Sequence, residues 1–488
     1  MKKIGLLLIL GGGLGVVFSL GADVVGIGKS GLQALQILGF QAGVFLAVFG
    51  WGVFQENRDQ SVAQPFSLKP FFAFIGQIPL AVWLWAGFLL VYACLFVPPV
   101  FLNKDLRLYY FINYIPDKYP IGVDIKNLTE YAFRWYTAGQ SPYLDFSSPY
   151  PPFSNFFASA LVLFGYPKVF YLVLMINYLA FFGIAVAYFL AVFRTLRMDV
   201  AAISFFLGTG LFSYGLLFEL ERGQLNLLVM FFAILAVVLF YYRPAFRLLA
   251  YLLFSMAVQI KIFPVFLVFM FVEDWHAWRA SLKRLIGLGL LNVAALFLMG
   301  YQEFINFLAS ISKRFVTPFR WVGNHSIYNF VWNLTHGGAG LVSPEVSNQL
   351  NQFAPALRTF LMVYVFACLV LIVVKAYREC ATGLNRYLLV ASTIAAMLIP
   401  SESQDYKLAF LAPVLAIFFA TQDFWDDIYP RFWGIAGVLL IAAAYSVIVF
   451  PFKYRPEFLQ FSSPALFVIL TVVTGLALFR KNNYRVTQ

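Results

Sequence analysis

Charged side chains are scarce in this chain. Only 11% of its 488 residues are Asp, Glu, Lys or Arg, while 62% are hydrophobic. An ordinary soluble domain is about a quarter charged and about half apolar, so this balance excludes a soluble globular enzyme. A disordered chain, a collagen and a coiled coil need other compositions and are excluded as well. Long apolar runs with few charges are instead typical of membrane-spanning helices.

Cysteine and histidine are also few. The three cysteines, Cys94, Cys368 and Cys380, are too scattered for a disulfide framework or a metal cluster, and we interpret them as small packing residues. His325 and His336 do not have the spacing of zinc ligands. The sequence also lacks a P-loop and a glycine-rich dinucleotide fingerprint. We therefore predict no metal, no cofactor and no site for ATP or a nucleotide sugar.

Positive charge is in excess, with 34 basic against 22 acidic residues and a net charge of +12. Lys and Arg lie in short connections between apolar runs, as the positive-inside rule describes, so nucleic acid is not an expected partner. Counting the apolar runs between these connections predicts an all-α polytopic membrane protein with about 11–13 transmembrane helices. We expect it in a bacterial inner membrane with both chain ends in the cytoplasm.

The apolar runs divide the chain into three predicted parts. Residues 1–71 hold two N-terminal transmembrane helices. The first of them, Ile4–Leu20, is interpreted as a retained span because no clear signal-peptide cleavage site follows it. Residues 72–421 form the core, and residues 422–488 hold the C-terminal transmembrane helices. The sequence shows no reliable internal repeat, which argues against an inverted-repeat transporter.

Two long external loops, 98–152 and 301–355, interrupt the predicted core. The first is too polar to cross lipid and too apolar to be disordered. Within it, Asp124–Gly139 has helical spacing with Gly139 as the expected C-cap, and we predict a short helix on the membrane surface. The next apolar run, Phe153–Phe164, is too short to cross a hydrocarbon layer roughly 30 Å thick, so we predict a re-entrant or interfacial helix. The apolar stripe of the first helix comprises Ile125, Leu128, Ala132 and Trp135.

Two other segments shape the predicted core. We expect Val200–Phe218 to be one outward span. In the run Leu248–Phe271, Lys261 and Pro264 stand in mid-segment. A charge and a proline there favour a broken helix that lines a cavity, so we predict that the chain turns back at this point.

Asp124 is a candidate general base. It opens a predicted helix just outside a span, where partial desolvation raises the pKa of a carboxyl group towards working pH. The alternative is that Asp124 only caps this helix, as Asp often does. Both interpretations remain open from the residues alone.

Three cationic side chains lie in unusual places. Arg222 has carboxylate and amide neighbours in sequence that could help it hold a phosphate or a sugar, or could form an ion pair within the segment. Lys261 lies within an apolar run, where an ionisable residue either binds a partner such as a lipid phosphate or reaches to the interface. Lys407, with Glu402 and Asp405, belongs either to a salt-bridged turn or to a substrate site.

Several short motifs together resemble the GT-C glycosyltransferases of family 87, a group that includes polyprenyl-phosphomannose-dependent mannosyltransferases. The resemblance extends over roughly residues 80–420. The chain departs from this pattern in its two N-terminal spans and in Ser-Gln-Asp-Tyr-Lys, which replaces a histidine-containing form. The motifs are the Asp124 helix start, Ala138-Gly-Gln-Ser-Pro-Tyr143 with Tyr150-Pro-Pro152, Glu221-Arg-Gly-Gln-Leu-Asn226, Gln259-Ile-Lys-Ile-Phe-Pro264 and Gly323-Asn-His-Ser326.

The resemblance implies a GT-C-like catalytic core in residues 72–421 and transfer of a sugar from a polyprenyl-phosphate donor to a lipid or glycan acceptor, with inversion. Asp124 corresponds to the catalytic base. For the donor phosphate and sugar, the candidate residues are Arg222, Gln224, Asn226, Lys261 and Lys407. For the acceptor or sugar, they are Tyr143, Tyr150, Glu219, Asn324, His325, Gln404 and Asp405. Membrane lipids are expected partners. The alternative function is a transporter or flippase of a lipid-linked or small polar substrate.

Overall fold

The structure is a computed structural model. It describes residues 2–21, 122–144, 148–165, 200–211, 213–316, 320–321, 323–336, 342–420, 432–449 and 461–479, with isolated positions between 46 and 180. Within these residues the fold is all-helical, as predicted, and two isolated β-bridges are its only extended pairings. The second predicted N-terminal helix and the first part of the loop 98–152 lie outside the described residues.

The first half of the described chain contains eight α-helices and three 3₁₀ helices. They are α1 (Lys2–Gly21), α7 (Val123–Ala138), α8 (Pro152–Leu161), η2 (Val162–Phe164), α10 (Val200–Leu211), α11 (Tyr214–Arg222), α12 (Asn226–Tyr242), η3 (Pro244–Phe246), α13 (Arg247–Ile260), η4 (Phe263–Phe271) and α14 (Trp278–Ala295).

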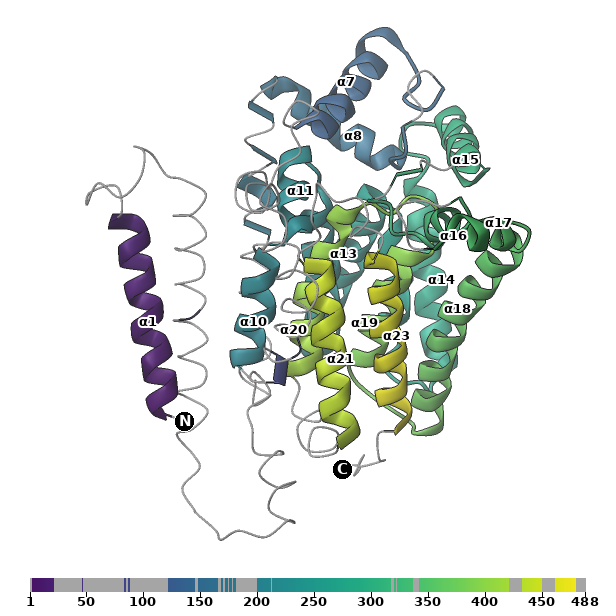
Figure 1. Cartoon of the computed structure of the whole chain (residues 1–488). Coiled ribbons are helices and arrows are strands. Elements are labelled where there is room, and N and C mark those ends of the chain that lie inside the picture. The colour runs from purple at the N-terminus through teal and green to yellow at the C-terminus, as the bar shows by residue number, and fades with distance from the viewer. Residues whose placement is uncertain are drawn as a thin grey trace.

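The second half continues with further helices. They are α15 (Tyr301–Val316), α16 (Ile327–Thr335), α17 (Pro344–Asn351), α18 (Ala354–Arg378), α19 (Arg386–Leu398), η6 (Asp405–Phe410), α20 (Leu411–Ala420), α21 (Phe432–Val449) and α23 (Ser462–Phe479). In Figure 1, α10, α14, α18, α19, α20, α21 and α23 run along a common direction. Helices α7, α8 and α15 gather at one end of this bundle, which we call the α7 end (Figure 1).

Two described helices are long and apolar enough to cross a membrane. They are α18, with 25 residues and a mean hydropathy of 2.6, and α23, with 18 residues and a mean hydropathy of 2.0. Helix α18 also exposes large apolar side chains, among them Phe360, Val363 and Val370. Water solvates such a surface poorly, whereas lipid chains cover it without cost. The total number of spans remains a prediction.

The predicted break at Lys261 is confirmed. Helix α13 ends at Ile260, Lys261 has extended backbone angles (φ −148°, ψ 130°), and the 3₁₀ helix η4 follows. Arg247 at the start of α13 pairs with Glu273 just after η4. The Tyr241 hydroxyl donates to the Val272 carbonyl at 2.9 Å. The chain therefore returns from Lys261 to the end of the bundle where α13 began.

The helix predicted within the first loop is also confirmed. Helix α7 ends at its C-cap residue Gly139, which has φ 65°. Backbone N–H groups at this cap donate to carbonyl groups in the last turn of the helix. Its buried residues, Ile125, Leu128 and Ala132, belong to the predicted apolar stripe, and the fourth member, Trp135, is half-buried. Left-handed backbone at a helix C-terminus is accessible to glycine at little cost, which explains why the helix stops there.

Two expectations were wrong. Val200–Phe218 is not one span, because α10 ends at Leu211 and α11 begins at Tyr214. The Ser213 hydroxyl accepts from the Leu216 N–H at 3.2 Å and donates to the Gly210 carbonyl at 2.7 Å, which satisfies one backbone group at each of the two helix ends. Cys380 is exposed with φ 49°, so it is not a packing residue, whereas Cys368 is buried.

Close packing of α10 against α20 depends on Gly210. A Cβ atom at this position would lie 2.3 Å from the Cβ of Ala412. We expect Gly210→Ala to destabilise the protein by about 1–3 kcal/mol, because the helices must separate. Gly287→Ala is the matched control, since a Cβ atom on α14 meets nothing within 4 Å. Thermal unfolding in detergent checks this; equal melting temperatures for the two variants would contradict it.

Candidate active site

The turn between α11 and α12 brings the side chains of Arg222 and Gln224 close to Asp124. Gly223 ends α11 with φ 65°, and a Cβ atom there would lie 2.8 Å from the Ile125 Cγ2 atom. The bare glycine lets α7 pack directly onto this turn. Asp124, in the first turn of α7, then faces Arg222 and Gln224.

The Asp124 carboxylate is held by a two-pronged ion pair. Arg222 donates from Nη2 to Oδ1 at 2.8 Å and from Nε to Oδ2 at 3.1 Å. Gln224 Nε2 donates to the same Oδ2. The two charged side chains are 17% and 19% exposed, so water screens their attraction only partly.

This arrangement answers two questions left open by the sequence. Asp124 does not cap α7, because Gly122 is the N-cap residue and makes no side-chain cap bond. Arg222 does not form its ion pair within its own segment, because its carboxylate partner is Asp124 from another helix. The pair therefore joins two elements that are far apart in sequence.

Lys261 reaches the same place from the break after α13. Its Nζ atom donates to Gln224 Oε1 at 2.8 Å and lies 4.3 Å from the ring centroid of Tyr150. Burial raises the pKa of the Tyr150 hydroxyl, and the charge of Asp124 adds to the increase. Tyr150 therefore stays neutral and offers Lys261 the face of its ring.

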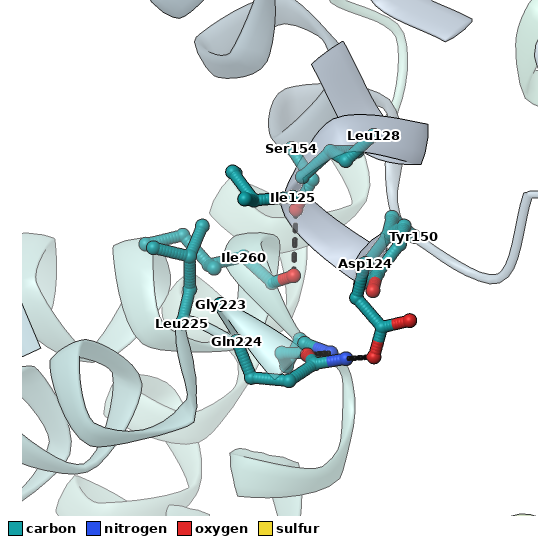
Figure 2. A pocket seen from close by; sticks show the side chains of 10 residues that line it. Asp124, Ile125, Leu128, Tyr150, Ser154, Gly223, Gln224, Leu225 and Ile260 are labelled. Carbon is teal, nitrogen blue, oxygen red and sulfur yellow. Dashed lines mark hydrogen bonds between the residues drawn. The ribbon is translucent and has the colours of Figure 1, made fainter. Parts of the chain in front are cut away.

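These side chains surround a small cavity with room for about one water molecule. Figure 2 shows Asp124 and Gln224 pointing toward one another, with Tyr150 beside Asp124. Ser154 closes the cavity from α8, where its hydroxyl donates to the Ile260 carbonyl at 2.6 Å. That bond satisfies a carbonyl group left open where α13 ends.

Glu219 and Asn226, both predicted to bind substrate, bond to each other in the structure. One Glu219 oxygen accepts from the backbone N–H groups of Asn226 at 2.5 Å and Leu227 at 3.1 Å, and the other accepts from Asn226 Nδ2 at 2.7 Å. Both residues are fully buried. The carboxylate thus caps the N-terminus of α12 and fixes the turn that carries Arg222 and Gln224.

A second polar cluster joins the segment Gly323–Ser326 to the segment Ser401–Lys407. Asn324 forms a β-bridge with Gln404, and its Oδ1 atom accepts from the Ser403 N–H at 2.9 Å. The Asp405 N–H donates to the Gly323 carbonyl at 2.9 Å. Asn324 and Gln404 therefore act in backbone pairing between two loops.

His325 lies at the centre of this second cluster. Its Nε2 atom is 3.0 Å from Ser403 Oγ, and its Nδ1 atom is 3.4 Å from Asp405 Oδ1. His325 is 1% exposed and Asp405 0%. Burial lowers the pKa of His325 well below its usual value, and the charge of Lys407 lowers it further, so the imidazole is neutral.

Lys407 is not part of a salt-bridged turn, the alternative left open by the sequence. Its Nζ atom donates to the Glu402 carbonyl at 3.0 Å and to Ser403 Oγ at 3.4 Å. The Glu402 carboxylate pairs instead with Arg314 at 2.6 Å. Lys407 also lies over the Phe263 ring, 4.9 Å from its centroid.

Tyr406 lies between the two clusters and was not among the predicted site residues. Its ring centroid is 5.8 Å from Lys261 Nζ, and Lys407 follows it directly in sequence. Phe263, which lies under Lys407, comes two residues after Lys261. Its position directly before Lys407, a predicted site residue, is the sequence signal that could have identified Tyr406.

Tyr143 is separated from these contacts. Its hydroxyl accepts from Asn155 Nδ2 at 3.0 Å, its ring packs 5.4 Å from Phe307, and it is 3% exposed. Of the two tyrosines predicted to bind sugar or acceptor, Tyr150 is the one that lines the cavity with Asp124. Among the described residues, no three His, Cys, Asp or Glu side chains gather as metal ligands would.

Comparison with known families agrees with the sequence pattern. The family model Glycosyltransferase family 87 matches residues 149–401, more than half of the chain. The chain belongs to this family. The matched range contains Arg222, Gln224, Lys261 and the segment Gly323–Ser326 of the second cluster. It begins after Asp124 and ends at residue 401, before Lys407. No curated protein matches the chain. Membership of this membrane-embedded family and the two candidate spans identify a membrane glycosyltransferase.

The ion pair that anchors α7 is open to a stability test. We expect Arg222→Ala to lower the free energy of unfolding by about 1–3 kcal/mol, because it leaves the Asp124 carboxylate partly buried without its main partner. Arg134→Ala, on the same helix as Asp124, is the control. Its pair with Glu130 is 46% and 41% exposed, so its loss costs little. Thermal unfolding of both variants measures the difference, and equal losses would show that the Arg222 pair does not anchor α7.

Proposed function

We propose that this glycosyltransferase moves a hexose or pentose, with mannose as the first candidate, from a polyprenyl-phosphate donor to a hydroxyl group of a lipid or glycan acceptor. The reaction inverts the anomeric centre and takes place on the extracytoplasmic face. The supporting observation is that Asp124 and Lys261 line one cavity at the α7 end, linked by Gln224, while Arg222 pairs with Asp124.

Asp124 acts as the general base in this proposal. Oδ2 accepts bonds from Arg222 and Gln224, while Oδ1 accepts one from Arg222. A carboxylate oxygen has two acceptor positions, so Oδ1 can take a bond from an acceptor hydroxyl. That hydroxyl oxygen attacks the anomeric carbon, its proton passes to Asp124, and the bond to the polyprenyl phosphate breaks on the opposite side.

Cationic side chains stabilise the phosphate that leaves. Lys261 lies over the Tyr406 ring, Lys407 lies over the Phe263 ring, and Arg222 pairs with Asp124. Ammonium and guanidinium groups in a water-poor site offset the charge that develops on a leaving monophosphate. Lys407 bonds only neutral oxygens in the described structure, so its positive charge can bind an anionic substrate.

An apolar cavity of about 510 Å³ between α7 and α8 supports a lipid substrate. Phe133, Phe153 and Phe157 are among its lining residues. Two of its three hydroxyl groups already donate to backbone carbonyls, Thr137 to Phe133 and Ser159 to Phe156, and the third belongs to Tyr136. The cavity therefore offers a hydrocarbon chain few competing polar contacts. Family membership favours this transferase over the transporter or flippase considered from the sequence.

Transfer itself tests the proposed base. We expect Asp124→Asn to reduce turnover by about 10²–10⁴-fold, because the amide is nearly isosteric but cannot accept the proton. Purified protein in lipid nanodiscs is incubated with radiolabelled polyprenyl-phosphate sugars and a membrane lipid extract. Glu130→Gln, an exposed carboxylate on the same helix, is the control. Wild-type turnover in Asp124→Asn would exclude Asp124 as the base.

Cysteine labelling tests the proposed orientation. In a background with Cys94, Cys368 and Cys380 replaced, Thr137→Cys on α7 should react with an impermeant thiol reagent outside intact cells, since this position is exposed. Ala280→Cys on α14 is the exposed counterpart near Lys283 and Arg284, two basic residues that the positive-inside rule places in the cytoplasm. It should react only after permeabilisation. The reverse pattern would invert the topology.

A further inference from the structure

Gln224 occupies a special place between the two charged groups of the cavity. Its Nε2 atom donates to Asp124 Oδ2, and its Oε1 atom accepts from Lys261 Nζ at 2.8 Å. Asp124 comes from α7 and Lys261 from the break between α13 and η4, so the amide spans two separate elements. With 4% exposure, Gln224 has little contact with solvent.

The chemistry of the two partners fixes the orientation of this amide. A carboxylate only accepts hydrogen bonds, and a lysine ammonium group only donates them. Turning the amide over would place its carbonyl oxygen against the carboxylate and its NH₂ group against the ammonium group. Both bonds would be lost and both contacts would become repulsive. Gln224 therefore has one favourable orientation.

The backbone of Gln224 is fixed as well. Its N–H donates to the Glu219 carbonyl at 3.1 Å, and its carbonyl accepts from Asn177 Nδ2 at 2.7 Å. Gly223, with φ 65°, packs against Ile125 just before it. The side chain thus extends from a rigid turn, and its terminal amide sets the position of both neighbours.

We infer that Gln224 is a positioning residue, which holds the Asp124 carboxylate and the Lys261 ammonium group at a fixed separation so that base and phosphate-binding cation face one substrate together. This inference rests on the proposed function for its catalytic consequence. It replaces the role of direct donor binding that the sequence suggested for Gln224.

No other common side chain fills this position equally well. Asn is one methylene shorter and cannot span the same gap from the same backbone. Glu accepts from Lys261 but brings a second carboxylate against Asp124, and two neighbouring carboxylates resist ionising together. Met has a similar length and supplies neither bond. Gln224 joins the two charges without adding a third charge that would compete with a phosphate.

The first test needs no substrate. Full-length protein in nanodiscs is treated with a carbodiimide and an amine nucleophile across a pH series, and mass spectrometry measures modification of Asp124, whose protonated form reacts. Gln224→Met removes a donor from the carboxylate, so modification should extend to higher pH than in wild type. Gln224→Glu should raise the midpoint of modification further. An unchanged midpoint in both variants would overturn the inference.

Gln259→Met is the matched control. Gln259 is also a buried glutamine close to Lys261 in sequence, but its Nε2 atom donates to the Asn292 carbonyl at 2.9 Å and not to the Asp124 cavity. It should leave the Asp124 midpoint unchanged. A shift of similar size in Gln259→Met would mean that general loosening of the bundle, and not the lost amide bridge, moves the midpoint.

Coupling between Lys261 and Asp124 gives a second readout. Lys261→Met should raise the Asp124 midpoint, and this effect should be smaller in a Gln224→Met background, because the bridging amide is already gone. Fully additive shifts would show that the two charges act on each other only through space and would overturn the bridging role.

Turnover separates this inference from the proposed function. With the donor that wild type uses, Gln224→Met should lose at least about tenfold in kcat with a smaller change in donor KM, since the groups remain but their geometry does not. The acidic limb of the pH–rate profile of Gln224→Glu should move to higher pH. Midpoint shifts with unchanged turnover would overturn the catalytic consequence. Failure of wild type to use any donor would instead count against the proposed function.

Discussion

The contact between the Asp124 carboxylate and the Arg222 guanidinium group joins α7 to α11. Two parallel N–H···O bonds fix both the distance and the plane of the two groups. Partial burial strengthens the attraction, and loss of either partner would leave a charge in a poor solvent. The orientation of α7, and therefore the shape of the cavity beside it, depends on this pair.

The surrounding polar groups have two roles: most of them fix the backbone, and a few border the cavity. Glu219 caps the helix α12 and so shapes the turn that presents Arg222 and Gln224. Asn324 and His325 tie one loop to another and place Lys407. In an apolar bundle each buried donor and acceptor needs a partner, so most of the polar residues in these loops are used to hold the backbone in place. A smaller group, around Asp124 and Lys261, borders the cavity.

Much of the fold was predictable because it depends on local pattern. The helix after Asp124, its glycine end at Gly139 and the break at Lys261 each follow from the preferences of a few neighbouring residues. The division of the run Val200–Phe218 was missed because hydropathy is almost continuous there. A single hydroxyl, on Ser213, caps the second helix. Cys380 was misassigned because it follows the charged residues Arg378 and Glu379 just beyond α18, and does not lie within an apolar run.

The sequence by itself determined an all-helical membrane protein, its glycosyltransferase family and the residue types of its site, because composition, hydropathy and short motifs are local properties. Tertiary structure alone decided which of these residues meet. It paired Arg222 with Asp124 instead of a near neighbour, and it set Gln224 between Asp124 and Lys261. It also bonded Glu219 to Asn226 and Tyr143 to Asn155. Hydrogen bonds and ion pairs act over a few ångströms, and only the packing of α7, α11 and α13 brings those distant positions within that range.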